Sequence, residues 1–397
     1  MSGRTGLAAP FLDRALRPVD KRGLPPPKAH CGGRWTQAGG GTSVRASPGT
    51  DSSRLAETAG KYPYIPRIAR WGFLLSWINM AIPPTTRLKP FSRMVDRSQL
   101  APDIVRLAKD GRRLVVEAGL SRAYRDERLY GTIWKRLPVM VRLFALTGES
   151  VREAFADLGD ASWQAGALSF CSALGDAILV PDRQFFSTDA HRHFRELAAA
   201  HAHNWDRRSD VVLWRGNLSG EGVTPANVEA CDSDNPALLA RIRLCLKLRG
   251  VAGADVKVPR GRISRDNPAA AAALDQAGIL GDFVRQEEWV NRKFAIDIDG
   301  FSNAWVNFYV RLVLGCCVIK VASGNGYRQW YYGDLVPWRH YVPVASDMSD
   351  LVEKVEWCRT HDREARAIGE AGQAFALSHT VASETVAAVR RIEAALG

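Results

Sequence analysis

The chain has 397 residues, of which 46% are hydrophobic and 24% are charged. This length favours two domains, and the composition excludes a wholly disordered protein. The formal net charge of +12 suggests a nucleic-acid or anionic-membrane partner. Residues 1–100, however, hold 16 Lys and Arg against 5 Asp and Glu, so the rest of the chain carries only +1. The charge of the main body therefore gives no support for a nucleic-acid partner.

Hydropathy and cysteine content limit the class of protein further. No apolar stretch reaches the roughly 18 residues of a membrane-spanning helix, and no secretory signal opens the chain. The 7 cysteines include no C-x-x-C pair, so a zinc ribbon or a redox motif has no support. We expect packed, reduced thiols in a cytosolic protein, with Cys316 and Cys317 on opposite faces of a strand.

The first 97 residues are predicted to lie outside the main α/β pattern. Residues 1–60 are rich in Gly, Pro, Arg and Ser without apolar periodicity, which predicts a disordered basic tail. An apolar run from Trp71 to Ile82 follows, with basic residues on both sides. Two interpretations stay open: an interfacial helix that brings 61–97 against an anionic membrane, or a buried helix that caps the first domain.

From residue 97 onward, apolar runs and turn residues predict alternating helices and strands. In the first half we expect helices at 98–111, 150–159 and 187–205, and strands at 112–118, 137–146, 166–173 and 176–182. In the second half we expect strands at 209–216, 254–259, 292–300, 316–322 and 341–344, and helices at 235–250, 267–278, 302–315, 349–360, 362–379 and 383–397.

This alternation is typical of parallel sheets in an α/β protein. The pattern divides into two halves that meet near residues 204–209. A cleft between the halves is where such proteins commonly bind ligands. We therefore predict domains at 61–205 and 206–376, followed by a C-terminal helix at 377–397.

The most informative segment is the strand-to-helix turn in KFAIDIDGFSNAW. Gly300 permits close approach of the backbone, Ser302 suits a helix N-cap, and the helix N-terminus that begins near Asn303 offers N–H groups to an anion. The alternative is an ordinary turn, because no complete phosphate-binding motif is present. Asp297 and Asp299 also form a D-x-D pair on one face of the strand, which is a less specific pattern for a divalent cation.

Three further groups of residues deserve a chemical interpretation. Arg215, followed by Gly216, ends a predicted strand and is either an anion-binding guanidinium or a surface residue. Asp182 follows a strand and is either a general base or a structural turn residue. Histidines also occur as HRH and HAH, at positions 191, 193, 201 and 203. Residues two apart on a helix point in different directions, so we expect a partly exposed helix face rather than a metal site.

The sequence of residues 293–375 resembles glycosyltransferase family 90. This family includes capsule xylosyltransferases, protein O-glucosyltransferases and bacterial lipopolysaccharide-type transferases. The resemblance rests on KFAIDIDGFSNAW, then YRQWYYGDLVPWRHYVPVASDMSDLVEKVEW, then HDREARAIGEAGQAF. Looser matches in DAILVPD and WRG extend it to roughly residues 166–376. The resemblance implies a GT-B-like fold, with two Rossmann-like domains and a cleft between them. It also implies an inverting transfer from a UDP-sugar without a metal.

By position, the resemblance assigns roles to individual residues. It implies that Asp182 is the catalytic carboxylate that deprotonates the acceptor hydroxyl. It implies that the donor nucleotide is bound by residues of three segments, namely Arg215 and Gly216, then Asp299, Gly300, Ser302 and Asn303, then Arg328 and Gln329. Eukaryotic members have an Arg in the helix where this chain has Val306 or Asn307, so Arg215, Arg262 and Arg328 are the candidates to neutralise a diphosphate.

We therefore expect a cytoplasmic enzyme, placed at the inner face of the membrane through 61–97, that transfers a sugar from UDP to a cell-surface glycan or glycolipid. It would need no cofactor or metal and bind no nucleic acid. Two alternatives stay open. One is a membrane-surface or nucleic-acid-binding protein that uses the basic front segment. The other is a degenerate transferase scaffold, suggested by Val306 and by Gln329, which replaces an acid.

Overall fold

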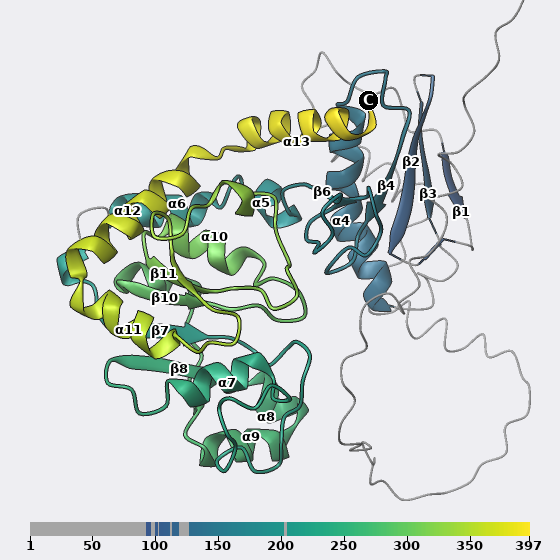
Figure 1. The fold of residues 1–397 in the computed structure, drawn as a ribbon. Coiled ribbons are helices and arrows are strands. Elements are labelled where there is room, and N and C mark those ends of the chain that lie inside the picture. The colour runs from purple at the N-terminus through teal and green to yellow at the C-terminus, as the bar shows by residue number, and fades with distance from the viewer. Residues whose placement is uncertain (1–92, 97–99, 102, 112, 119–126, 202–204) are drawn as a thin grey trace, which may run out of the picture. The chain divides into compact units, whose positions relative to one another are not determined.

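A computed structural model of the chain describes residues 93–96, 100–101, 103–111, 113–118, 127–201 and 205–397. The predicted tail at 1–60 and the apolar segment at 71–82 lie outside these residues. Residues 1–91 and 92–397 are separate units, and every described residue belongs to the second. Its described part is a mixed α/β structure with two six-stranded sheets, which confirms the α/β class (Figure 1).

The first sheet is mixed rather than parallel. Its strands are β1 (Arg93–Asp96), β2 (Ile104–Asp110), β3 (Arg113–Ala118), β4 (Glu153–Asp157), β5 (Leu168–Ser169) and β6 (Ile178–Leu179). They lie in the order β1-β3-β2-β4-β5-β6. β2 runs antiparallel to both β3 and β4, while the other neighbouring pairs are parallel. The expectation of parallel pairing is therefore wrong at β2.

Three predicted elements of this half have the wrong type. Residues 98–111 and 150–159 were expected to be helices, but they contain β2 and β4, whose buried residues alternate with more exposed ones. Residues 137–146 were expected to form a strand, but they belong to the helix α4 (Glu127–Ala145). A short apolar run fits a buried strand or a buried helix equally well, and tertiary packing decides between them. The predicted strands at 112–118, 166–173 and 176–182 are confirmed as β3, β5 and β6.

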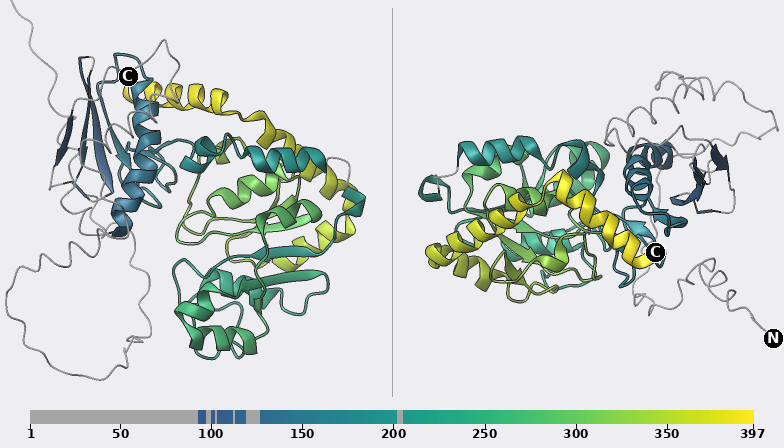
Figure 2. Two further views of the ribbon diagram at one scale, coloured as in Figure 1. Left: turned by 180° about the vertical axis from the view of Figure 1, so that it is seen from behind. Right: turned by 90° about the horizontal axis from the view of Figure 1, so that it is seen from above.

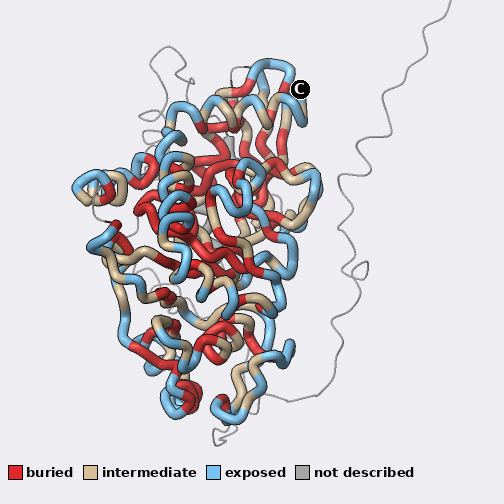
Figure 3. Tube along the Cα trace, turned by 60° about the vertical axis from the view of Figure 1, so that its left-hand side comes forward, coloured by how far each residue is buried: buried red, intermediate tan, exposed pale blue. Residues whose placement is uncertain are grey.

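The second sheet is parallel throughout and follows the predicted order of elements. Its strands are β7 (Val212–Arg215), β8 (Ala254–Pro259), β9 (Leu280–Gly281), β10 (Phe294–Asp297), β11 (Cys317–Val321) and β12 (Val342–Val344). They lie in the order β12-β11-β10-β7-β8-β9, so β10 and β11 each have a neighbouring strand on both sides. These central strands, β10 and β11, are completely buried, as expected for strands covered by helices on both faces (Figure 3).

Helices cover both faces of this sheet (Figures 1 and 2). The helices of this part of the chain are α5 (Arg183–Ser187), α6 (Arg192–Ala200), α7 (Ala240–Lys247), α8 (Arg262–Asp266), α9 (Pro268–Gln276), α10 (Val306–Val313), α11 (Leu351–Thr360), α12 (Asp362–Ser378) and α13 (Val381–Leu396). Short 3-10 turns are η3 (Trp205–Arg207), η4 (Gln286–Asn291) and η5 (Tyr332–Asp334). α13 continues beyond α12 and packs against α4 and β6.

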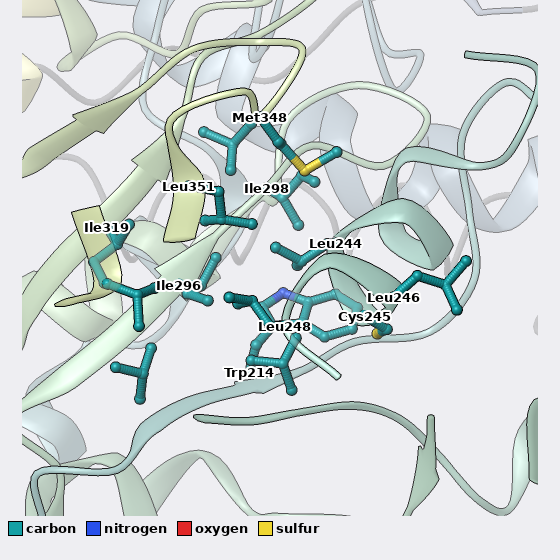
Figure 4. Close-up of a cluster of buried hydrophobic side chains, with 14 of the residues drawn as sticks. Trp214, Leu244, Cys245, Leu246, Leu248, Ile296, Ile298, Ile319, Met348 and Leu351 are labelled. Carbon is teal, nitrogen blue, oxygen red and sulfur yellow. The ribbon is translucent and has the colours of Figure 1, made fainter. Parts of the chain in front are cut away.

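Alternating residues of the central strands enter two different cores. Phe294 and Ile296 pack into a cluster with α7, α9 and α11, part of which is drawn in Figure 4. Ala295 faces the opposite side and packs with α6 and α10. Cys317 belongs to the first cluster and Cys316 to the second, which confirms that the two thiols lie on opposite sides of the sheet. The two cores hold the sheet from both faces, and they therefore fix the positions at which its strands end and its loops begin.

Candidate functional site

The turn from β10 to α10 lies at the carboxyl ends of the central strands. Figure 1 shows α10 beside β10 and β11. Gly300 has no room for a side chain, because a Cβ atom there would come within 2.9 Å of the Arg241 guanidinium and also collide with Ser219 Oγ. The carbonyl oxygen of Gly300 in turn lies close to Gly220, whose φ is +118°. The chain therefore requires glycine at both positions to bring the two turns into contact.

Ser302 and Asn303 are buried in this turn, with 1% and 2% of their surface exposed. Ser302 Oγ and Asn303 Nδ2 have no oxygen or nitrogen partner in the described part of the chain. The group that faces them is the thiol of Cys171, which is a weak hydrogen-bonding group. Burial raises the pKa of that thiol, so it stays neutral. Unsatisfied buried donors are costly, and such groups are frequent where a ligand is bound.

A buried charge cluster lies directly behind the turn. Lys320 of β11 is the register partner of Asp297 on β10, and its Nζ lies 2.8 Å from Asp297 Oδ2. The same Nζ lies 3.4 Å from Asp299 Oδ1. Burial raises the pKa of Asp299, and the Lys320 ammonium opposes that shift. One ammonium therefore contacts both carboxylates of the D-x-D pair and offsets one of their two negative charges.

Two buried arginines complete this cluster. Arg241 of α7 donates hydrogen bonds to the carbonyl oxygens of Asp299, Ile298 and Asn217. The guanidinium of Arg311 on α10 lies over the ring of Trp289, 4.6 Å from its centroid. Burial lowers the pKa of both arginines, and the nearby Asp297 carboxylate opposes the shift. Three cations thus share two carboxylates, and the cluster is left with one excess positive charge.

The loop after β5 joins this site through its backbone. Ser172 and Arg328 form an antiparallel bridge, and Arg328 also donates a side-chain hydrogen bond of 2.9 Å to the Leu174 carbonyl. Cys171, on the same loop, brings this segment beside Ser302 and Asn303. The site therefore combines the carboxyl ends of β5, β10 and β11.

Asp182 caps a helix. Its Oδ1 accepts hydrogen bonds from the backbone nitrogens of Gln184 at 2.6 Å and Phe185 at 3.1 Å, at the start of α5. The residue is only 6% exposed, and burial raises its pKa, against the effect of the two N–H donors. A carboxylate with a raised pKa is a stronger base, which suits the predicted role of Asp182. That catalytic role stays a prediction. Asp176, six residues earlier, is exposed in the same segment.

Arg215 has structural partners in this structure. Its guanidinium pairs with Asp255 at 2.7 Å and donates to the carbonyl oxygens of Asp255 and Asp282. These contacts connect β7 to β8 and to the segment after β9. Gly216 follows directly and lies against the ring of Trp214. The predicted contact of Arg215 with a diphosphate stays a prediction, and such a contact would have to compete with the Asp255 carboxylate.

The remaining predicted residues differ in exposure. Arg328 is exposed beside the Ser172 loop, while Gln329 is buried and accepts a hydrogen bond of 3.2 Å from the Tyr331 hydroxyl. Arg262 is exposed and pairs with Asp266 on its own helix. The structure therefore brings Asp299, Gly300, Ser302 and Asn303 together in one turn, and it connects Arg328 to that region through Ser172 and Cys171.

The histidine prediction is wrong for one residue. His191 is buried, adopts a left-handed backbone with φ +61°, and packs against Phe185 and Tyr309. Burial lowers its pKa to about 4, so it is neutral at physiological pH. His193 is exposed, as expected, and lies 3.3 Å from Glu287. Among the described residues, no group of three or more His, Cys, Asp or Glu side chains could hold a metal ion.

Sequence reasoning missed Lys320, Arg241 and Arg311. A lysine inside the apolar strand CCVIKV was a usable signal, because a buried charge requires a partner. Its partners, however, depend on the pairing of β10 with β11, which sequence alone does not show. Arg241 and Arg311 resembled ordinary helix-surface residues.

The geometry defines an α/β protein whose central turn presents unpaired polar groups and excess positive charge. Comparison with known proteins identifies the family. A family model described as Glycosyl transferase family 90 matches residues 169–388, more than half of the chain. The chain belongs to this family. The resemblance seen in the sequence is confirmed.

Several curated relatives are similar to parts of this chain. Protein O-glucosyltransferase 3 of Homo sapiens is 31% identical over 193 residues, which cover 42% of this chain and 38% of that protein. Protein O-glucosyltransferase 2 of Danio rerio is 41% identical over 87 residues, covering 22% and 17%. Uncharacterized protein 035R of Invertebrate iridescent virus 3 is 30% identical over 179 residues, covering 45% and 16%. The chain thus spans well under half the length of these relatives.

Proposed function

We propose that the protein is an inverting glycosyltransferase that moves a sugar from a UDP-sugar to a hydroxyl group of a glycan or glycolipid acceptor. The observation that carries this proposal is the turn Gly300–Asn303, where two buried donors lack an oxygen or nitrogen partner in front of a cluster with excess positive charge. The membership of family 90 supports the reaction class. The names of the curated relatives support glucose as the first sugar to test.

A nucleoside diphosphate matches the chemistry of this turn. Its phosphate oxygens accept hydrogen bonds, which Ser302 Oγ and Asn303 Nδ2 can donate. Lys320, Arg241 and Arg311 provide an electrostatic field that favours an anion, and α10 begins close by with its free N–H groups at that end. Negative charge develops on the leaving diphosphate during transfer, so groups that stabilise it also lower the reaction barrier.

Inversion at the sugar carbon requires one base near the acceptor. The base takes the proton from the acceptor hydroxyl, the resulting oxygen forms a bond to C1 of the sugar, and the bond from C1 to the diphosphate oxygen breaks. Asp182 is our predicted base, and its raised pKa supports that role. Its burial in a helix cap argues for Asp176 as a second candidate, because that carboxylate is exposed in the same segment.

The first experiment measures UDP release from a panel of UDP-sugars by the purified protein. Release above the rate without protein, for any donor, supports the proposal and excludes a degenerate scaffold. Ser302→Ala combined with Asn303→Ala should weaken UDP binding about tenfold or more, because two charge-assisted hydrogen bonds are lost. Absence of UDP binding by the wild-type protein would contradict the proposal.

The second experiment separates the two carboxylates. Asparagine caps a helix as well as aspartate does, so Asp182→Asn keeps α5 intact and removes only the base. We expect this variant to bind UDP like the wild type and to lose transfer, while Asp176→Asn keeps both. The reverse result assigns the base to Asp176.

The finer parts of the proposal concern arrangement and location. We propose that the two α/β halves form a GT-B-like arrangement and that transfer requires no metal. We also propose that the protein is cytoplasmic and is held at the inner face of the membrane by residues 61–97. None of the described helices is both long and apolar enough to cross a bilayer. Deletion of residues 1–92, which leaves β1 intact, should release the protein from membrane fractions without loss of UDP binding.

A further inference from the structure

The D-x-D pair of this chain has an internal cation. Lys320 Nζ lies 2.8 Å from an oxygen of Asp297 and 3.4 Å from an oxygen of Asp299. The same Nζ lies 5.5 Å from the ring centroids of Phe308 and Tyr332. The ammonium is therefore contacted from β10, the turn after it, α10 and η5. It occupies the point on which both carboxylates converge.

We propose that Lys320 is a positioning residue that replaces a divalent cation between Asp297 and Asp299, and that it thereby holds the Gly300–Asn303 turn ready for a nucleoside diphosphate. In a metal-dependent D-x-D site, the carboxylates bind a divalent cation that in turn binds the diphosphate. Here the covalently attached ammonium lies where that cation would lie, and it offsets one of the two negative charges of the pair. This inference rests on the proposed function for its nucleotide part, but not for its metal part.

The position of Asp299 explains how Lys320 acts at a distance. Asp299 is followed directly by Gly300, and its own carbonyl oxygen accepts a hydrogen bond from Arg241. Lys320 holds the side chain of Asp299 while Arg241 holds its backbone. Both constraints fix the start of the turn that ends in Ser302 and Asn303. Without the ammonium, two carboxylates would face each other at low solvent exposure, where like charges repel strongly.

Lys320→Met tests the proposal, because methionine keeps an unbranched side chain and removes the charge. Lys320→Arg keeps the charge. A matched control is Lys354→Met: Lys354 of α11 likewise lies near two carboxylates, Asp350 and Glu353, and over an aromatic ring, that of Trp338. Circular dichroism and thermal melting establish that each variant is folded.

The first measurement uses Mn²⁺ without nucleotide, followed by electron paramagnetic resonance. We expect no site-bound Mn²⁺ in the wild type or in Lys354→Met, and one bound Mn²⁺ in Lys320→Met. Specific Mn²⁺ binding by the wild type, or none by folded Lys320→Met, overturns the proposal. This arm decides the role of Lys320 even if UDP proves to be the wrong nucleotide.

The second measurement is UDP affinity by calorimetry, in EDTA and then in excess Mn²⁺. The wild type should bind UDP equally in both. Lys320→Met should bind about tenfold more weakly in EDTA and recover in Mn²⁺, and Lys320→Arg should lose less without needing metal. Affinity of Lys320→Met equal to that of the wild type in EDTA, or no recovery in Mn²⁺, overturns the proposal.

The wild-type arms remain decisive if Lys320→Met does not fold. UDP binding by the wild type that disappears in EDTA would show that a separate metal is required, and it would overturn the proposal. UDP binding that is independent of EDTA supports it. Failure of the wild type to bind UDP, GDP or ADP contradicts the proposed function, while the Mn²⁺ result still judges the inference on Lys320.

Discussion

The main chains of Ser172 and Arg328 exchange two hydrogen bonds, 3.2 Å from the Ser172 nitrogen and 3.0 Å from the Arg328 nitrogen. These residues belong to loops that follow strands of different sheets, β5 and β11. The exchange fixes the segment that continues to Asp176 and Asp182 against the segment that continues to Gln329. The proposed base and part of the proposed donor site are therefore connected through backbone rather than through mobile side chains.

The hydroxyl of Ser172 stabilises this connection. It donates to the Ser162 carbonyl and accepts from the Leu174 nitrogen, both at 3.0 Å, and the residue is fully buried. Ser172→Ala removes both hydrogen bonds, so we expect a loss of about 2 kcal/mol in the free energy of unfolding. Urea denaturation measures it. The exposed Ser187→Ala on α5 is the control and should change stability by less than about 0.5 kcal/mol.

The cap of α5 makes a separate prediction for Asp182. Alanine cannot accept the hydrogen bonds from Gln184 and Phe185, so Asp182→Ala should lower the free energy of unfolding by about 1 to 2 kcal/mol. Asp182→Asn should stay close to the wild type in thermal melting. Equal destabilisation by both substitutions would contradict the capping role.

Asp157 gives the protein a measurable pH dependence. Burial raises its pKa from 3.8 to about 6, so the folded state binds a proton more tightly than the unfolded state. The contribution of Asp157 is fully present below pH 4 and decreases as the pH rises towards 6, by about 3 kcal/mol. Asp157→Asn cannot titrate. Its stability relative to the wild type should therefore increase between pH 4 and 7, and parallel curves would disprove the assignment.

Gly300 is predicted to tolerate no side chain. A Cβ atom would contact Arg241 and Ser219, so Gly300→Ala must move the turn or the guanidinium. We expect a loss of about 1 to 3 kcal/mol in stability, as for other overpacked sites, together with weaker UDP binding. Gly333→Ala is the control, because a Cβ atom at that exposed position meets nothing within 4 Å.

The second half of the chain was predictable because its strands are short apolar runs between clear helix signals. The first half was not, since LPVMVRLFAL fits a strand or a helix, and only its place in α4 decides. At the site, the strand-to-helix turn after Asp299 was predictable. The predicted N-cap at Ser302 is wrong, because α10 begins at Val306 with Trp305 in the N-cap position, and Ser302 Oγ does not cap it. Lys320 could not be assigned to Asp297, because that pairing depends on the register of two strands more than twenty residues apart.

The partners of α13 have a consequence for synthesis on the ribosome. Glu393 accepts a hydrogen bond from the Gly148 nitrogen, and Arg391 donates one to the Leu179 carbonyl, at sequence separations of 245 and 212 residues. Synthesis proceeds at about 5 to 20 residues per second, so α13 is made roughly 10 to 40 s after the edge strand β6 that it covers. During that interval the first sheet is a nascent-chain intermediate with an uncovered edge, and it is the segment on which a ribosome-associated chaperone would act.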